Sequence, residues 1–118
     1  MKTILLDTSF ILTALEHRID IIGEIHRLVD SNVKIMIIDK TLREFNGKEM
    51  EGVALQYIKQ NNIQSIATDE DKNVDSLLLS HATPEMMVAT QDKGLKEKLK
   101  KRRIGVITIR QQRYLHVV

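Results

Sequence analysis

A run of three aliphatic residues that stops abruptly at an acid constrains this chain more than any other feature. Ile4, Leu5 and Leu6 are followed by Asp7, and apolar side chains then return at helical spacing over residues 10–15. A short, continuous aliphatic run is typical of a strand that is buried on both faces of a parallel sheet. Because open α/β sheets bind ligands at the carboxyl ends of their strands, we expect Asp7 at a ligand site.

Further aliphatic runs alternate with amphipathic stretches along the rest of the chain. The predicted strands cover residues 4–6, 33–38, 63–67, 86–90 and 106–109, and the predicted helices cover residues 9–16, 18–30, 39–45, 48–60, 73–82 and 93–103. This alternation predicts an α/β fold, doubly wound, with a mainly parallel five-stranded sheet flanked by helices. The tail, residues 111–118, is expected to pack as an edge segment. A length of 118 residues fits a single domain spanning 1–118.

Composition excludes several classes of chemistry. The chain contains no cysteine, which rules out disulfides, zinc thiolates and thiol nucleophiles and fits a cytoplasmic location. No apolar run approaches the length of about 20 residues that spans a bilayer, so no membrane association is expected. A glycine-rich phosphate loop is also missing, which disfavours a bound nucleotide cofactor.

Acidic residues stand at four positions that this layout could bring together. Asp7 and Asp92 each follow a predicted strand, Glu44 lies on the short helix after the second strand, and Asp75 lies in the first turn of a later helix. If the first and fourth strands are neighbours, all four point into one crevice at the carboxyl edge of the sheet. Each residue taken alone has an ordinary interpretation, as a helix N-cap or a solvated helix residue.

Carboxylates gathered in one crevice repel each other unless cations neutralise them. Oxygen-only ligands favour Mg²⁺ or Mn²⁺ over zinc. Such an ion lowers the pKa of a bound water and neutralises charge on a phosphate oxygen, so the pattern points to hydrolysis of a phosphodiester. Ser9 and Thr90 flank the acids and are expected to support them or a metal-bound water.

Basic residues are concentrated near the C-terminal end. Residues 93–113 contain nine lysines and arginines and one acid, which leaves nine bases and fifteen acids elsewhere. Such a run is either a solvated helix face or a surface that contacts phosphates. The RNA-binding candidates are Lys93, Lys96, Lys100, Arg103, Arg110 and Arg113. Because aromatic residues are scarce, we expect binding through backbone charge and RNA shape.

Four motifs give the chain a family resemblance over essentially its whole length: LLDTSFIL, TLREF, NVDSLLLSHA and MVATQDKGLKEKLKKRRIGVITIR. In their order and spacing the chain resembles the PIN-domain nucleases, and most of all archaeal members similar to the ribosome-biogenesis branch. The toxins of toxin–antitoxin pairs share the same core. The resemblance implies an endoribonuclease dependent on Mg²⁺ or Mn²⁺, and pairing as a homodimer. It also implies that Asp7, Glu44, Asp75 and Asp92 are the metal-binding and catalytic acids, with Ser9 and Thr90 as hydroxyl partners.

The sequence departs from the family pattern at three positions. Ser9 and Gln91 stand where other residues are frequent, and Ser76 follows Asp75 where a second acid is common. If the alignment of the second or third motif is shifted, the substitute acids are Asp39, Asp69 and Asp71. The alternatives are an rRNA-processing enzyme, a toxin with an antitoxin partner, and a non-catalytic RNA-binding scaffold.

Overall fold

The computed structural model describes residues 1–29, 32–68 and 71–118. Its strands form one sheet with the order β3-β2-β1-β4-β5-β6. Their bounds are β1 Lys2–Leu6, β2 Val33–Ile38, β3 Gln64–Ile66, β4 Met87–Ala89, β5 Gly105–Arg110 and β6 Tyr114–Val117. The first five are parallel, and β6 pairs antiparallel with β5. The α/β class and the mainly parallel sheet predicted from the sequence are thus confirmed.

β1 and β4 are direct neighbours in the sheet, which is the condition for the four acids to share one crevice. Leu5 pairs with Val88 and Leu6 with Ala89 across these two strands. The chain winds outward from β1 to β2 and β3, then returns to β4 on the other side of β1. The point where the strand order reverses is where open α/β sheets bind ligands.

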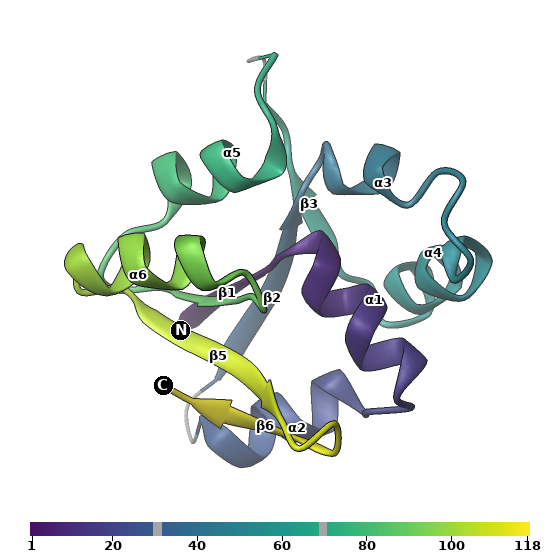
Figure 1. The fold of residues 1–118 in the computed structure, drawn as a ribbon, viewed down its shortest axis with the longest axis horizontal. Coiled ribbons are helices and arrows are strands. Elements are labelled where there is room, and N and C mark those ends of the chain that lie inside the picture. The colour runs from purple at the N-terminus through teal and green to yellow at the C-terminus, as the bar shows by residue number, and fades with distance from the viewer. Residues whose placement is uncertain (30–31, 69–70) are drawn as a thin grey trace.

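Helices cover both faces of the sheet (Figure 1). Their bounds are α1 Thr8–Glu16, α2 Ile21–Leu28, α3 Thr41–Glu44, α4 Glu51–Gln60, α5 Val74–His81 and α6 Lys93–Lys101. One core cluster joins Ile4 and Leu6 of β1 to α1, α2 and α4, and a second joins Leu5 to α5 and α6. Because successive strand side chains point to opposite faces, the three-residue aliphatic run of β1 supplies both cores.

The structure differs from the sequence prediction in the tail. The edge segment forms a sixth strand, β6, held to α2 as well as to β5. The Glu24 carboxylate accepts a hydrogen bond from the Leu115 backbone N–H at 2.9 Å, and Arg27 donates to the Leu115 carbonyl at 2.8 Å. Buried Leu115 fixes which face of this short strand points inward.

Two helix predictions also need correction. The helix expected over residues 18–30 begins only at Ile21, because Arg18 has a φ of 57° and Asp20 caps the helix by accepting from Gly23 N. Asp30 and Ser31, where its end was expected, lie outside the described residues. The helix expected from residue 48 begins at Glu51, and the apolar Val53 near its start is 49% exposed. In the described part of the chain, no helix has the length and apolarity needed to cross a membrane.

Candidate functional site

Asp7 lies at the tip of β1 and begins α1. Its side chain is only 3% exposed, and its Oδ1 caps the helix by accepting from the Thr8 backbone N–H at 2.8 Å. Its Oδ2 accepts hydrogen bonds from the hydroxyls of Thr90, at 2.7 Å, and Ser9, at 3.3 Å. The carboxylate is therefore oriented by two chain segments that are far apart in the sequence.

Asp92 caps α6 at the tip of the neighbouring strand. Its Oδ1 accepts from the Leu95 backbone N–H at 2.8 Å, and its own N–H donates to the Thr90 hydroxyl oxygen at 3.1 Å. The Thr90 hydroxyl thus stands between the two aspartates, accepting from the backbone of one and donating to the carboxylate of the other. This single buried group couples the ends of β1 and β4.

Gln91 has a role that no sequence pattern indicates, because its position is marked only by a departure from the family pattern. Its Oε1 accepts hydrogen bonds from the Thr108 hydroxyl and the Ile109 backbone N–H, both at 2.7 Å. These bonds tie the loop between Thr90 and Asp92 to β5. A polar residue between two site residues was the only sequence signal, and nothing local identified its partners.

Glu44 comes from α3 and is held against α1. Its Oε1 accepts a hydrogen bond from the Thr8 hydroxyl, which also lies 3.2 Å from the hydroxyl of buried Thr41. Thr8 is thus the link between the first and second acidic motifs. Its backbone N–H donates to Asp7 Oδ1, and its hydroxyl donates to Glu44.

Asp75 is placed by the cap of α5. The side chain of Asn73 accepts from the Ser76 backbone N–H at 2.9 Å and so fixes the first helical turn. Asp75 is the second residue of this helix. Its carboxylate accepts no hydrogen bond from the described residues, which leaves both of its oxygens free for a ligand.

All four acids line one cavity of about 520 Å³. The cavity wall is completed by Thr8, Ser9, Leu12, Arg43, Asn46 and Lys48. Thr90 lies behind this surface, fully buried, and contacts the lining residues Asp7 and Asp92 through its hydroxyl. The structure therefore brings together in one cavity the four acids that were predicted from separate sequence motifs.

The electrostatics of the cavity reflect this crowding. Burial raises the pKa of Asp7 above its usual value, hydrogen bonding from Thr90 opposes this effect, and the charge of Asp75 adds to it. Burial likewise raises the pKa of Asp75, followed by repulsion from Asp92 and Glu44, with Lys98 acting in the opposite sense. A bound cation would favour the charged form of each group.

The donor set fits a hard divalent cation, because the acids in the cavity wall offer carboxylate oxygens and no histidine lies among its lining residues. Among the described residues, however, no three acidic or histidine side chains are placed closely enough to hold one ion together. Both oxygens of Asp7 already accept hydrogen bonds. One oxygen each of Glu44 and Asp92 is also engaged, by a threonine hydroxyl and by a helix cap. The four acids thus share a cavity without forming a closed ligand cage.

The substitute acids do not line this cavity. Asp39 accepts from the backbone N–H and the hydroxyl of Thr68, at 2.9 and 2.6 Å, and so joins the ends of β2 and β3. These bonds lower the pKa of Asp39 to about 2. Asp71 is exposed and precedes α5, and Asp69 lies outside the described residues.

The predicted RNA-binding bases also lie outside the cavity wall. None of Lys93, Lys96, Lys100, Arg103, Arg110 and Arg113 is among its lining residues. The bases that do line it, Arg43 and Lys48, come from α3 and the segment before α4. No sequence pattern indicates these two residues, because they stand apart from the basic run.

Comparison with known proteins identifies the family. Residues 4–112 match the family model described as a PIN like domain. The chain belongs to the PIN-domain family. A relative from Methanocaldococcus jannaschii, Ribonuclease VapC4, is 32% identical over 129 residues, covering 99% of this chain and 97% of that protein.

The PIN fold is also seen in a solved structure. The PIN domain endonuclease Utp24 superposes with a TM-score of 0.81 at 21% identity, covering 98% of this chain and 90% of that one. This likeness concerns the fold. The family resemblance found in the sequence motifs is thereby confirmed, and the carboxyl edge of this PIN domain carries the four acids.

Proposed function

We propose that this PIN domain is a metal-dependent endoribonuclease that hydrolyses RNA phosphodiester bonds. The observation that carries the proposal is the cavity, in which four carboxylates from four separate segments meet at the strand-order reversal. Similarity to a protein named a ribonuclease, over nearly the full length of both chains, supports it.

Asp7, Glu44, Asp75 and Asp92 are the proposed metal-binding and catalytic residues. Mg²⁺ or Mn²⁺, when bound among them, would activate a water molecule and neutralise charge on a phosphate oxygen. The protein's contribution is orientation. Hydroxyls of Thr90 and Ser9 hold Asp7, and the Thr8 hydroxyl holds Glu44, so that the remaining lone pairs of these carboxylates would be available to an ion in the cavity.

The basic C-terminal region supplies diffuse positive charge for RNA in this proposal. The residues concerned are Lys93, Lys96, Lys100, Arg103, Arg110 and Arg113. They lie on α6, in the segment between α6 and β5, at the end of β5 and in the turn that follows it, and none of them enters the cavity wall. Such contacts attract a polyanion without reading its sequence.

The proposal is tested by incubating the chain with fluorescently labelled RNA in the presence of Mn²⁺, Mg²⁺ or EDTA. Wild type should cleave with either ion and not with EDTA. Asp7→Asn keeps the size and a capping oxygen but removes the charge, and it should lose cleavage by at least about a hundredfold while still binding RNA. Full activity of Asp7→Asn, or equal cleavage in EDTA, would refute the assignment.

A toxin role is the second candidate, favoured by similarity to a protein named VapC4. A toxin of this kind would be neutralised by an antitoxin partner, whereas a processing enzyme would not need one. Induced expression separates the two: a toxin arrests growth, Asp7→Asn does not, and co-expression of a neighbouring small gene restores growth. The absence of growth arrest, with cleavage of ribosomal RNA precursors, would favour rRNA processing.

A non-catalytic scaffold is the remaining alternative. A scaffold has no evident use for four crowded carboxylates, two of which have pKa values raised by burial and repulsion. Calorimetric titration of Mn²⁺ decides between the two. Heat of binding that disappears in Asp7→Asn supports the enzyme, and no heat with no thermal shift supports the scaffold.

A further inference from the structure

Three hollows lie in a row along the carboxyl edge of the sheet. The central cavity shares Asp75 and Asp92 with a hollow of about 280 Å³ between α5 and α6. On the opposite side it shares Leu12 and Lys48 with a hollow of about 270 Å³ beside the start of α4. Because neighbouring hollows share lining residues, they adjoin one another, and we call the three together the groove. The four carboxylates lie in its central hollow, and Glu16 and Glu49 also line its α4 end.

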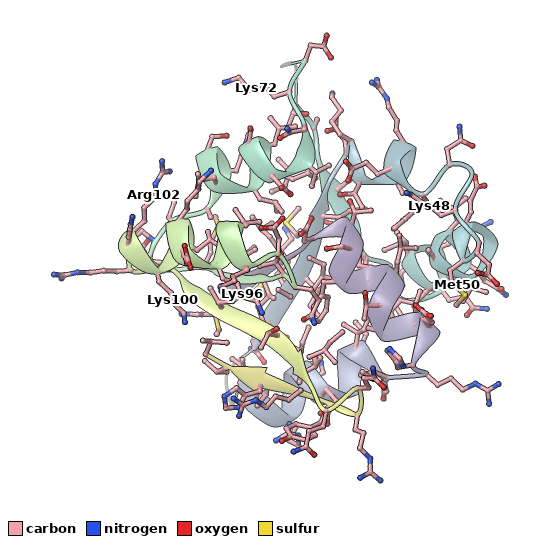
Figure 2. All side chains as sticks on the ribbon, viewed as in Figure 1. Lys48, Met50, Lys72, Lys96, Lys100 and Arg102 are labelled. Carbon is pink, nitrogen blue, oxygen red and sulfur yellow. The ribbon has the colours of Figure 1, made fainter. Side chains whose placement is uncertain are left out.

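Each end of this groove carries a lysine. Lys98 of α6 lines the hollow between α5 and α6, and its charge acts on Asp75. Lys48 lines both the central cavity and the hollow beside α4, and Arg43 stands near it in the cavity wall. Among the described residues, neither lysine forms an ion pair with an acid. Figure 2 shows Lys48 beside α3 and α4, well away from α6.

The other lysines of α6 are placed differently. Lys96 and Lys100 line none of these three hollows. In Figure 2 they project from the edge of α6 opposite to Arg102, whose guanidinium donates to the Leu79 carbonyl of α5 at 2.9 Å. The basic run of the sequence therefore divides into a side that faces α5 and the groove, and a side that does not.

Charge explains why the groove needs cations at its ends. A phosphate backbone is repelled by the four central carboxylates and by Glu16 and Glu49 at the α4 end, so a strand crosses the groove only if positive groups hold it on both sides. Grooves that follow a single strand with basic residues are a general way of binding nucleic acid without reading its sequence.

We propose that Lys98 and Lys48 hold one extended RNA strand on opposite sides of the four carboxylates, with Arg43 assisting Lys48. The inference rests on the proposed function for the identity of the strand and of its cleaved bond. It adds two positioning contacts, one of which lies on a segment remote from the basic run. The strand then passes from the α5–α6 side, over Asp7, to the start of α4.

Cross-linking tests this path. Because the chain contains no cysteine, an introduced cysteine is the single thiol that a maleimide can label. A single cysteine is introduced as Lys48→Cys or Lys98→Cys in the Asp7→Asn background and labelled with a photoreactive maleimide. The probe is an end-labelled oligoribonucleotide whose cleavage position has been mapped with wild type. Lys59→Cys on α4 and Lys101→Cys on α6 are the matched controls, because both are exposed and line none of the three hollows.

The groove predicts cross-links from Lys48→Cys and Lys98→Cys on opposite sides of the mapped bond. Coincident positions, or yields no higher than those of the controls, would overturn it. If the chain fails to cleave any RNA, the order of the two cross-links along the strand is compared instead. Failure of the nuclease proposal is therefore distinguishable from failure of the path.

Binding provides a second, independent readout. Lys48→Ala and Lys98→Ala should each weaken binding about two- to fivefold and reduce the slope of log affinity against log salt by about 0.7. If the strand spans both ends, one of the two substitutions should no longer weaken the binding of an RNA that is truncated on one side of the cleavage position. The other substitution should weaken it as before. Lys100→Ala should weaken binding without any such dependence on the truncated side. Equal responses of both groove variants to both truncations would contradict the proposal.

Discussion

The Thr90 hydroxyl donates a hydrogen bond of 2.7 Å to Oδ2 of Asp7, across 83 positions of sequence. The same hydroxyl accepts from the Asp92 backbone N–H at 3.1 Å. One side chain of β4's tip therefore sets the orientation of the acid on β1 and the start of the helix that carries the next acid. The arrangement depends on β1 and β4 being direct neighbours.

Thr90→Val should separate this hydrogen bonding from packing, because valine keeps the shape and loses the hydroxyl. We expect Mn²⁺ affinity or cleavage to fall about ten- to a hundredfold, because Asp7 loses its orienting donor. The free energy of unfolding should fall by about 1–3 kcal/mol, because the Asp92 N–H also loses its acceptor. Calorimetry and urea unfolding measure the two effects, with Thr90→Ser as the control that restores both. Unchanged metal binding in Thr90→Val would show that Asp7 needs no such support.

Gln91→Ala should loosen the loop that carries Asp92. Its Oε1 accepts from the Ile109 N–H and the Thr108 hydroxyl, so alanine leaves both donors without a partner, and we expect a loss of about 1–3 kcal/mol in unfolding free energy. Thr108→Val removes one of the two donors and should cost less, because the backbone bond remains. A larger loss for Thr108→Val than for Gln91→Ala would contradict this assignment.

Thr8→Val should release Glu44 from α1. The Thr8 hydroxyl donates to the Glu44 carboxylate. The Thr8 backbone N–H donates to Asp7 Oδ1, and the substitution does not change this bond. We therefore expect weaker Mn²⁺ binding with α1 still formed, as followed by calorimetry and circular dichroism. Thr8→Ser retains the hydroxyl and should behave like wild type; if it fails as badly as valine, the hydrogen bond is not the cause.

Asp39 should contribute stability that depends on acid pH. Hydrogen bonds from Thr68 lower its pKa to about 2 from an ordinary 3.8. Because the folded-state pKa is the lower one, the contribution is complete above about pH 4 and is lost as the pH falls through about 2. Comparing the melting temperature of wild type with that of Asp39→Asn should show a gap that narrows over this range. A gap that stays constant from pH 5 to 2 would contradict the role assigned to the charge.

The sequence by itself determined the local parts of this protein. The aliphatic run Ile4–Leu6 required a doubly buried strand, and the acid after it capped the next helix, because burial periodicity and capping depend on near neighbours. The mainly parallel sheet was readable from the alternation of strand and helix patterns, and the PIN family from the resemblance of four motifs. Even so, the helix expected over residues 48–60 begins only at Glu51, so the local pattern did not define its first turn.

Only the tertiary structure decided which groups meet. The pairing of β1 with β4 brings Thr90 to Asp7, and the pairing of β4 with β5 brings Gln91 to Thr108. Packing of α6 against α5 turns Lys98, and not Lys100, toward the groove. No local pattern specifies these partners, because they depend on the order of the strands and on how each helix is rotated against its core.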